Sequence, residues 1–251
     1  MYDLEGNPSK WNKVKEQILE GDLIVTVGLL GTVMVRDGIR DIPSKKMIFS
    51  MLFDPGRFSL PDKTATGVSL DLLPETAFSK IKQIFPNVKK VGILYDPQKN
   101  KNIIEANKTA AKSAGLSLIV TPVLSEKDVP RAVSDLFDQI DLLWLIPDST
   151  VLTPQSIAFI LLSSLEHRLP IVTFSEDLVK MGATASISPD YKAVGETLGK
   201  LTQRVLKGED VRKIPLEYVK KNRLTINKKT AQKIGIEIPK EVLKNSDRVY
   251  E

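Results

Sequence analysis

The sequence predicts an α/β fold in which parallel sheets are covered by helices on both faces. From Lys89 onward, apolar runs of strand length alternate with amphipathic segments of helix length, and the loops between them are short. Earlier runs such as 22–28 are almost continuously apolar, which is typical of buried parallel strands. With 42% apolar residues, the 251-residue chain can bury one large core or two lobes of roughly 100 residues each.

The first predicted element is a helix. Asn7 is placed as its N-cap and Pro8 at its first position, and Trp11, Val14 and Ile18 then share one face. The strand 22–28 follows, and Gly31-Thr32 opens the next helix. A crossover helix normally joins two parallel strands, and this one has no strand before it. We therefore expect a leading unit of the fold to be missing from this chain.

The remaining elements follow from the same patterns. Residues 216–226 alternate polar with apolar residues, which predicts an edge strand with one wet face. The Lys-rich tail after Asn227 predicts one short helix before Pro239 and another after it. Strands are expected at 46–53, 65–70, 91–95, 116–123, 140–147, 170–175 and 183–188, and helices at 74–85, 100–114, 128–138, 178–181 and 190–206.

The composition excludes several kinds of site. The chain has no cysteine, so disulfides, thiolate zinc sites, iron–sulfur clusters and cysteine nucleophiles are ruled out. Its net charge is +5, but the lysines stand among acids along most predicted helices, which favours solvated faces over a nucleic-acid surface. We find no signal segment and no apolar stretch of about 18 residues that would span a membrane.

The sequence holds no recognisable catalytic motif. The single histidine, His167, ends a helix, where a cation favours the helix dipole, so a structural role is expected. Ser175 lacks the flanking glycines of a nucleophile elbow. Gly28-Leu-Leu-Gly31-Thr32 lacks the spacing of phosphate-binding loops, although its N–H groups can still hold a carboxylate at a helix N-terminus. We therefore predict that the protein is not an enzyme and uses no cofactor.

Acidic residues are the most informative polar groups, because each follows a predicted strand. Asp96 and Asp190 are as well explained by helix capping as by ligand contact. Asp148 and Glu176 follow neighbouring strands and are expected to lie side by side, where they suit an ammonium group or a divalent cation. Because no metal-ligand spacing is recognisable, we expect an ammonium-bearing small molecule and no metal. An enzyme that uses this pair with a metal is the weaker alternative. The acids at strand ends are Asp54, Asp96, Asp148, Glu176 and Asp190.

Several motifs together resemble the ABC transporter substrate-binding protein family that includes tryptophan- and tyrosine-type binding proteins. They occur in the family's order over nearly the whole chain, which is more specific than any one of them. The motifs are Val91–Pro97, Pro147–Thr150, Phe174–Glu176, Gly182-Ala183, Ser188–Tyr191 leading to Gly195, Ile226–Ala231 and Ile238-Pro239.

The resemblance implies two doubly wound parallel-sheet lobes of the type I periplasmic-binding-protein architecture, which close on a small ligand without catalysis. Lobe one would comprise 1–70 with 187–212, and lobe two 71–186 with 213–251. An amino acid, aromatic among other candidates, would be held by N–H groups and Thr32 at its carboxylate, by Asp148 or Glu176 at its ammonium and by Tyr95 at a flat side chain. The implied ligand contacts are Gly28, Thr32, Asp54, Tyr95, Asp148, Ser149, Thr150, Ser175, Glu176 and Asp190.

The chain departs from the family pattern at two places. Gly28-Leu-Leu-Gly31 replaces a smaller, Gly-Thr-Pro-like sequence, so the carboxylate site is expected to differ. The family's signal segment and first strand–helix–strand unit are not found before Pro8, so lobe one is expected to be shortened. A shortened lobe exposes a sheet edge, for which we expect reduced stability, homodimerisation or a partner that supplies strands.

The missing segment leaves two functions open. The first is the receptor of an ABC importer, extracytoplasmic and working with a permease. The second is a ligand-sensing regulatory domain of the same fold, which would be cytoplasmic if Met1 is the true start.

Overall fold

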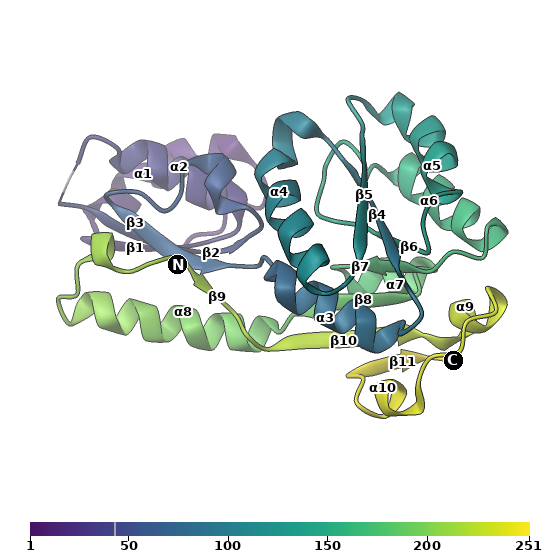
Figure 1. Ribbon diagram of the computed structural model, residues 1–251. Coiled ribbons are helices and arrows are strands. Elements are labelled where there is room, and N and C mark those ends of the chain that lie inside the picture. The colour runs from purple at the N-terminus through teal and green to yellow at the C-terminus, as the bar shows by residue number, and fades with distance from the viewer. Residues whose placement is uncertain (43) are drawn as a thin grey trace. The chain divides into compact units, whose positions relative to one another are not determined.

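The computed structural model describes residues 1–42 and 44–251, and the chain forms two compact units (Figure 1). Unit 1 comprises Met1–Asp71 and Pro189–Lys221, and unit 2 comprises Leu72–Ser188 and Asn222–Glu251. The chain therefore passes from one unit to the other three times. The third passage follows Lys221 rather than residue 212, because the segment after 212 adds a strand to the sheet of unit 1.

Unit 1 is built on a four-stranded sheet with the order β1-β2-β3-β9, and each of its pairs is parallel. Asn7 begins the first helical segment as predicted, with its side chain accepting a hydrogen bond from the N–H of Ser9 at 3.0 Å. The strands are β1 (Leu23–Val27), β2 (Lys46–Leu52), β3 (Ala65–Ser69) and β9 (Glu217–Tyr218). The helical segments are η1 (Pro8–Lys10), α1 (Trp11–Glu20), α2 (Leu29–Ile39), η2 (Pro55–Phe58), α8 (Tyr191–Leu206) and η4 (Val211–Lys213).

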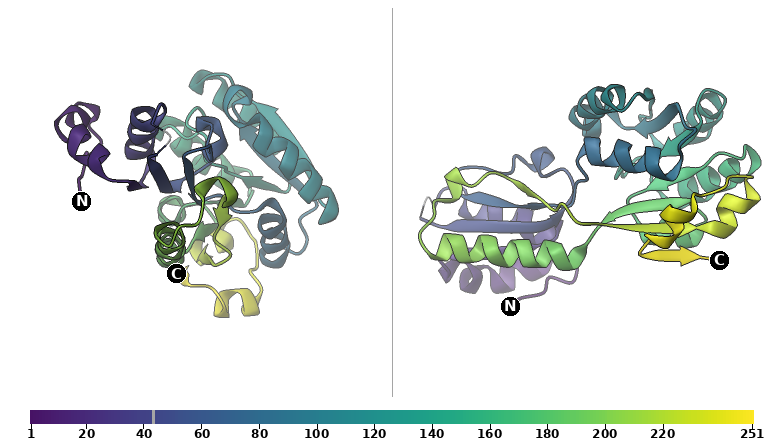
Figure 2. Two further views of the ribbon diagram at one scale, coloured as in Figure 1. Left: turned by 90° about the vertical axis from the view of Figure 1, so that its left-hand side faces the viewer. Right: turned by 60° about the horizontal axis from the view of Figure 1, so that its bottom comes forward.

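Alternating residues of β2 divide the core of unit 1 into two layers. Met47 and Phe49 pack with α1 and α2 on one face, whereas Ile48 packs with α8 on the other face. Figure 2 shows α8 running along its face of the sheet. Burial on both faces explains why the central strands read as continuous apolar runs.

Gly67 allows the two central strands of unit 1 to approach closely. A Cβ atom at this position of β3 would lie 2.3 Å from the carbonyl oxygen of Phe49 in β2. The pairing of these strands also shifts between Phe49 and Leu52, where Met51 has φ 63°. Such an irregularity bends the end of β2, from which the chain enters the turn at Asp54.

Unit 2 is built on a seven-stranded sheet with the order β11-β10-β8-β7-β6-β4-β5. Its strands are β4 (Lys90–Tyr95), β5 (Ser117–Pro122), β6 (Leu142–Trp144), β7 (Ile171–Thr173), β8 (Ala185–Pro189), β10 (Asn222–Asn227) and β11 (Arg248–Tyr250). Its helical segments are α3 (Pro74–Ile84), α4 (Pro97–Ser113), η3 (Glu126–Asp128), α5 (Val129–Phe137), α6 (Pro154–Glu166), α7 (Glu176–Met181), α9 (Lys228–Lys233) and α10 (Lys240–Lys244).

Helices cover both faces of this sheet as well. One buried cluster joins the sheet to α3 and α4, with contributions from Ala231 of α9 and Val242 of α10. A second cluster joins the opposite face to α5, α6 and α7. Phe78 of α3 meets Trp144 of β6 edge to face, with ring centroids 5.2 Å apart. The predicted α/β class, with parallel sheets covered on both faces, is therefore confirmed.

The prediction for residues 216–226 is wrong. These residues form two strands, of which β9 belongs to unit 1 and β10 to unit 2. β10 is no edge strand, since it lies between β8 and β11, and the N–H of Asn227 donates to the carbonyl of Thr184 at 2.8 Å. The stretch that alternates in sequence therefore spans the passage between the units and holds two short strands instead of one.

No helix among the described residues has the length and apolar character needed to cross a bilayer.

Candidate ligand-binding site

The turn after β1 in unit 1 presents a helix N-terminus. Gly28 caps α2 with φ 87°, a conformation that glycine adopts without strain, and its N–H donates to the carbonyl of Ser50 at 2.9 Å. Thr32 is fully buried, and its hydroxyl lies 2.7 Å from the carbonyl of Gly28 and 2.9 Å from the hydroxyl of Thr26. The hydroxyl of Thr32 therefore stabilises the turn. The first N–H groups of a helix such as α2 have no acceptor within the helix itself.

A pair of carboxylates follows β2 and β3 at the same edge. Asp54 adopts φ 45°, and its N–H donates to both carboxylate oxygens of Asp71, at 2.9 and 3.1 Å. The hydroxyl of Ser69 donates to Asp71 at 2.6 Å. Burial raises the pKa of Asp71, and burial also raises the pKa of Asp54 by more than the charge of Arg57 lowers it. Burial and then the charges of Asp71 and Asp54 raise the pKa of Tyr218 in β9.

Asp190 caps α8 in unit 1. Its carboxylate accepts a hydrogen bond from the N–H of Ala193 at 3.1 Å and lies 2.9 Å from the ammonium of Lys221. Hydrogen bonds from Lys221 and Ala193 lower the pKa of Asp190. The capping role considered for this residue is therefore confirmed.

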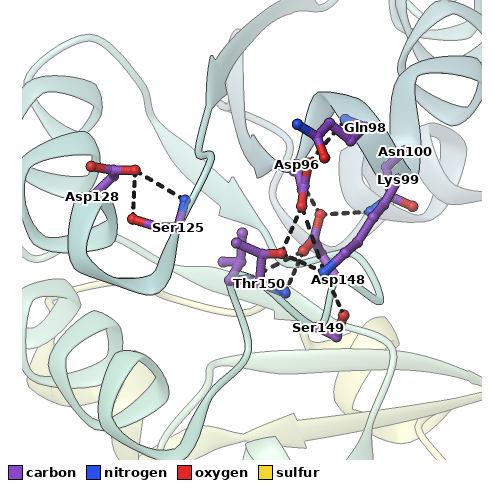
Figure 3. A network of polar contacts seen from close by, with 10 residues as sticks. Asp96, Gln98, Lys99, Asn100, Ser125, Asp128, Asp148, Ser149 and Thr150 are labelled. Atoms are coloured by element: carbon purple, nitrogen blue, oxygen red, sulfur yellow. Dashed lines mark hydrogen bonds and ion pairs between the residues drawn. The ribbon is translucent and has the colours of Figure 1, made fainter.

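Asp148, which follows β6 in unit 2, is 2% exposed and braces two loops (Figure 3). One carboxylate oxygen accepts from the N–H of Asp96 at 2.7 Å and from the side-chain amide of Asn100 at 2.6 Å. The other accepts from the N–H groups of Thr150 and Val151 at 2.8 and 3.2 Å. Four donors thus occupy the carboxylate, and a ligand ammonium would have to compete with them.

Asp96, at the end of β4, completes the network. It caps α4 by accepting from the N–H of Gln98 at 2.9 Å, and its other oxygen accepts from the hydroxyl of Thr150 at 2.7 Å. The ammonium of Lys99 lies 2.6 Å from the hydroxyl of Thr150 and 3.0 Å from that of Ser149. Burial opposes ionisation of Asp96, but the hydrogen bonds from Thr150 and Gln98 and the charge of Lys99 outweigh it and lower its pKa.

The residues after β7 form a separate polar group. Ser175 caps α7, with its hydroxyl oxygen accepting from the N–H of Asp177 at 3.2 Å. Glu176 accepts from the hydroxyl of Tyr250 at 2.8 Å and from the guanidinium of Arg248 at 2.5 Å. The Tyr250 hydrogen bond and then the Arg248 charge, working against burial, lower the pKa of Glu176. Glu176 and Asp148 were expected to lie side by side as one acidic pair. In the structure each carboxylate has its own set of hydrogen-bond donors, and the two sets share no residue.

Sequence reasoning missed four residues at these strand ends. Asp71 follows β3 and satisfies the strand-end rule that selected the other acids, so a signal for it was present. Lys99 and Asn100 lie in the first turn of α4 and Tyr218 in a two-residue strand, where no pattern marks them. The described chain holds no three acidic or histidine side chains close enough together for a metal ion. Tyr95 ends β4 half-buried against the core, and the ring of His167 packs edge to face on Phe137.

The chain forms two parallel-sheet units, passes between them three times and carries polar turns at the strand ends of both. This is the architecture of the periplasmic-binding-protein folds. Residues 6–250 match the ABC transporter substrate binding protein family, and the chain belongs to that family.

Relatives within this family include binding proteins for aromatic amino acids. The chain is 24% identical over 224 residues to a tyrosine-binding protein of Clostridioides difficile (strain R20291), a match that covers 86% of this chain and 64% of that relative. The chain therefore spans just under two thirds of the length of that relative.

Solved structures show the same fold. The ABC domain from Streptococcus pneumonia in complex with L-Trp is 28% identical, with a TM-score of 0.72 over 98% of this chain and 85% of that one. A ligand-free, open substrate binding protein from Clostridium difficile has a TM-score of 0.75 at 20% identity, covering 99% of this chain and 84% of that one.

Proposed function

We propose that the protein is the substrate-binding component of an ABC import system and that its ligand is an amino acid, with aromatic amino acids as the first candidates. The observation that carries the proposal is the similarity, over 98% of the chain, to a domain in complex with L-Trp. The polar turns at the carboxyl ends of both sheets support it, because open α/β sheets bind ligands there. The permease of the import system is the partner that this role requires.

The proposed role is binding without catalysis. Asp96, Asp148 and Glu176 are engaged by internal donors, and the pKa values of Asp96 and Glu176 lie below their usual range. The lowered pKa values of Asp96 and Glu176 make these two carboxylates poor general acids or bases near neutral pH. We place the working protein outside the cytoplasmic membrane, since its proposed partner takes up ligand there.

Calorimetric titration tests the proposal. L-Trp, L-Tyr and L-Phe, followed by a panel of other amino acids, nucleobases and sugars, are titrated into the full chain. We expect heat of binding with at least one aromatic amino acid and a weaker affinity in Ser149→Ala, an exposed residue at the ligand edge. Ser134→Ala, on the surface of α5, is the matched control and keeps the affinity. No heat of binding with any compound of the panel contradicts the proposal.

We also propose that unit 1 supports a homodimer through β1. Among the described residues, β1 pairs with β2 on one side only, and its side chains Val25 and Val27 are 43% and 66% exposed. An exposed apolar edge strand is a template for pairing with another chain. A second copy offers the same edge, and two such edges satisfy each other symmetrically.

A further inference from the structure

Lys99 is a cation at the strand ends of unit 2. It lies in the first turn of α4, and its side chain is 32% exposed. Its ammonium reaches the loop after β6, where it donates to the hydroxyls of Thr150 and Ser149 at 2.6 and 3.0 Å (Figure 3). The ammonium is therefore held in place mainly by neutral oxygens.

The carboxylates around Lys99 are committed to other donors. Asp148 accepts four hydrogen bonds and is 2% exposed. Asp96 is 4% exposed, holds the N–H of Gln98 and the hydroxyl of Thr150, and lies 3.5 Å from the ammonium, which is long for a hydrogen bond. The two carboxylates are thus buried and hydrogen-bonded, and the ammonium of Lys99 is the more exposed charge of this group.

Ser149 adds a donor beside this charge. Its side chain is exposed, and its oxygen accepts from Lys99, so its own O–H proton is directed elsewhere. Thr150 differs, because its O–H already donates to Asp96. An ammonium and a hydroxyl 3.0 Å apart form a donor pair that suits the two oxygens of a carboxylate.

We infer that Lys99 and Ser149 form an oxyanion subsite that binds the carboxylate of the ligand, with Thr150 and Asp96 holding Lys99 in position. The inference rests on the proposed function for the identity of the ligand, and it assigns to unit 2 the carboxylate and not the ammonium. A cation fixed by neighbouring hydroxyls loses little conformational entropy when the ligand arrives, which strengthens binding.

Ligands with and without the charge test the subsite. L-Trp and L-tryptophanamide, in which a neutral amide replaces the carboxylate, are titrated into the unmodified protein and into Lys99→Met. We expect the unmodified protein to prefer the acid by about tenfold or more, and Lys99→Met to lose most of that preference while its affinity for the amide changes by less than about threefold. Lys101→Met, at an exposed lysine two residues further along α4, retains the full preference.

A second measurement separates this inference from the proposed function. Sodium acetate alone is added while the side-chain nitrogen resonance of Lys99 is followed by NMR, in the unmodified protein and in Ser149→Ala. A saturable shift that weakens in Ser149→Ala supports the subsite even if no amino acid binds, in which case only the ligand class is wrong. An unchanged acid preference in Lys99→Met, or no acetate-dependent shift at Lys99, overturns the inference.

Discussion

The two units solve the same structural problem differently at their strand ends. In unit 2, the loops after β4 and β6 are tied together by carboxylates that accept several donors each, and Lys99 lies over them. In unit 1, the corresponding edge relies on backbone groups, with the N–H of Asp54 resting on the carboxylate of Asp71. Ionisation is favoured at Asp96 and disfavoured at Asp71, so the pKa values of these two carboxyl groups shift in opposite directions.

The two edges differ in how firmly their loops are held and in how the ionisation of their carboxyl groups affects stability. A carboxylate that accepts several hydrogen bonds from two loops holds those loops in one arrangement. A buried carboxylate with a raised pKa stores an unfavourable interaction that a proton relieves. We therefore expect unit 2 to provide a preformed surface, and we expect the stability contributions of Asp71 in unit 1 and Asp96 in unit 2 to change with pH in opposite directions.

Removing the central acceptor of unit 2 should have the largest effect. Asp148→Ala leaves up to four donors without an acceptor, and we expect a loss of about 3 kcal/mol or more in the free energy of unfolding. Urea denaturation followed by circular dichroism measures it. Ser149→Ala, at the neighbouring exposed residue, should change the free energy by less than about 0.5 kcal/mol. Equal effects at the two positions would show that the network does not hold unit 2 together.

A backbone contact takes the corresponding place in unit 1. In Gly67→Ala the new methyl group meets the carbonyl of Phe49, so β2 and β3 must separate, at a cost of about 2 kcal/mol or more. Gly199→Ala is the matched control, since nothing lies within 4 Å of its added Cβ atom in α8, and it should gain about 0.5 to 1 kcal/mol. Thermal and urea unfolding measure both. A Gly67→Ala variant whose free energy of unfolding equals that of the unmodified protein contradicts the described pairing of β2 and β3.

The opposite pKa shifts predict opposite dependences on pH. Asp71 holds its proton longer in the folded chain, so its contribution lowers stability as pH rises from the ordinary value of 3.8 through the raised pKa. Asp96 contributes stability above 3.8 that is lost as pH falls through its lowered pKa. Carbon-detected NMR of the carboxyl groups measures both, and Thr150→Val should raise the pKa of Asp96. Shifts of the same sign at both residues would remove the contrast.

The smallest effect concerns the free edge of unit 1. Val27→Lys places a charge on the exposed side of β1 and should shift a monomer–dimer equilibrium towards monomer without changing the free energy of unfolding by more than about 0.5 kcal/mol. Sedimentation equilibrium over a range of protein concentrations measures it. Lys101→Met, in unit 2, is the control and leaves association unchanged. A protein that is monomeric at every concentration contradicts the proposed homodimer.

Pattern and chemistry predicted much of the fold but less of the site. Periodicity gave the order of helices and strands, because burial on both faces leaves strong apolar runs. β11 escaped prediction because it has three residues in a charged tail, and β9 and β10 were merged because periodicity does not show that the chain changes sheets. The site depends on pairs far apart in sequence, such as Asp148 with Asn100, 48 residues away. Spacing along the chain does not reveal which acidic side chains accept hydrogen bonds from the protein's own donors.

The late strand β9 has a consequence for synthesis of the protein. The hydroxyl of Thr66 in β3 donates to the carbonyl of Ile214, 148 residues later, next to the strand that completes the sheet of unit 1. During translation the first 71 residues must therefore wait with β3 unpaired on one side while most of unit 2 emerges from the ribosome. Exposed strands of this kind are prone to aggregate, so we expect chaperone dependence to be concentrated in that interval.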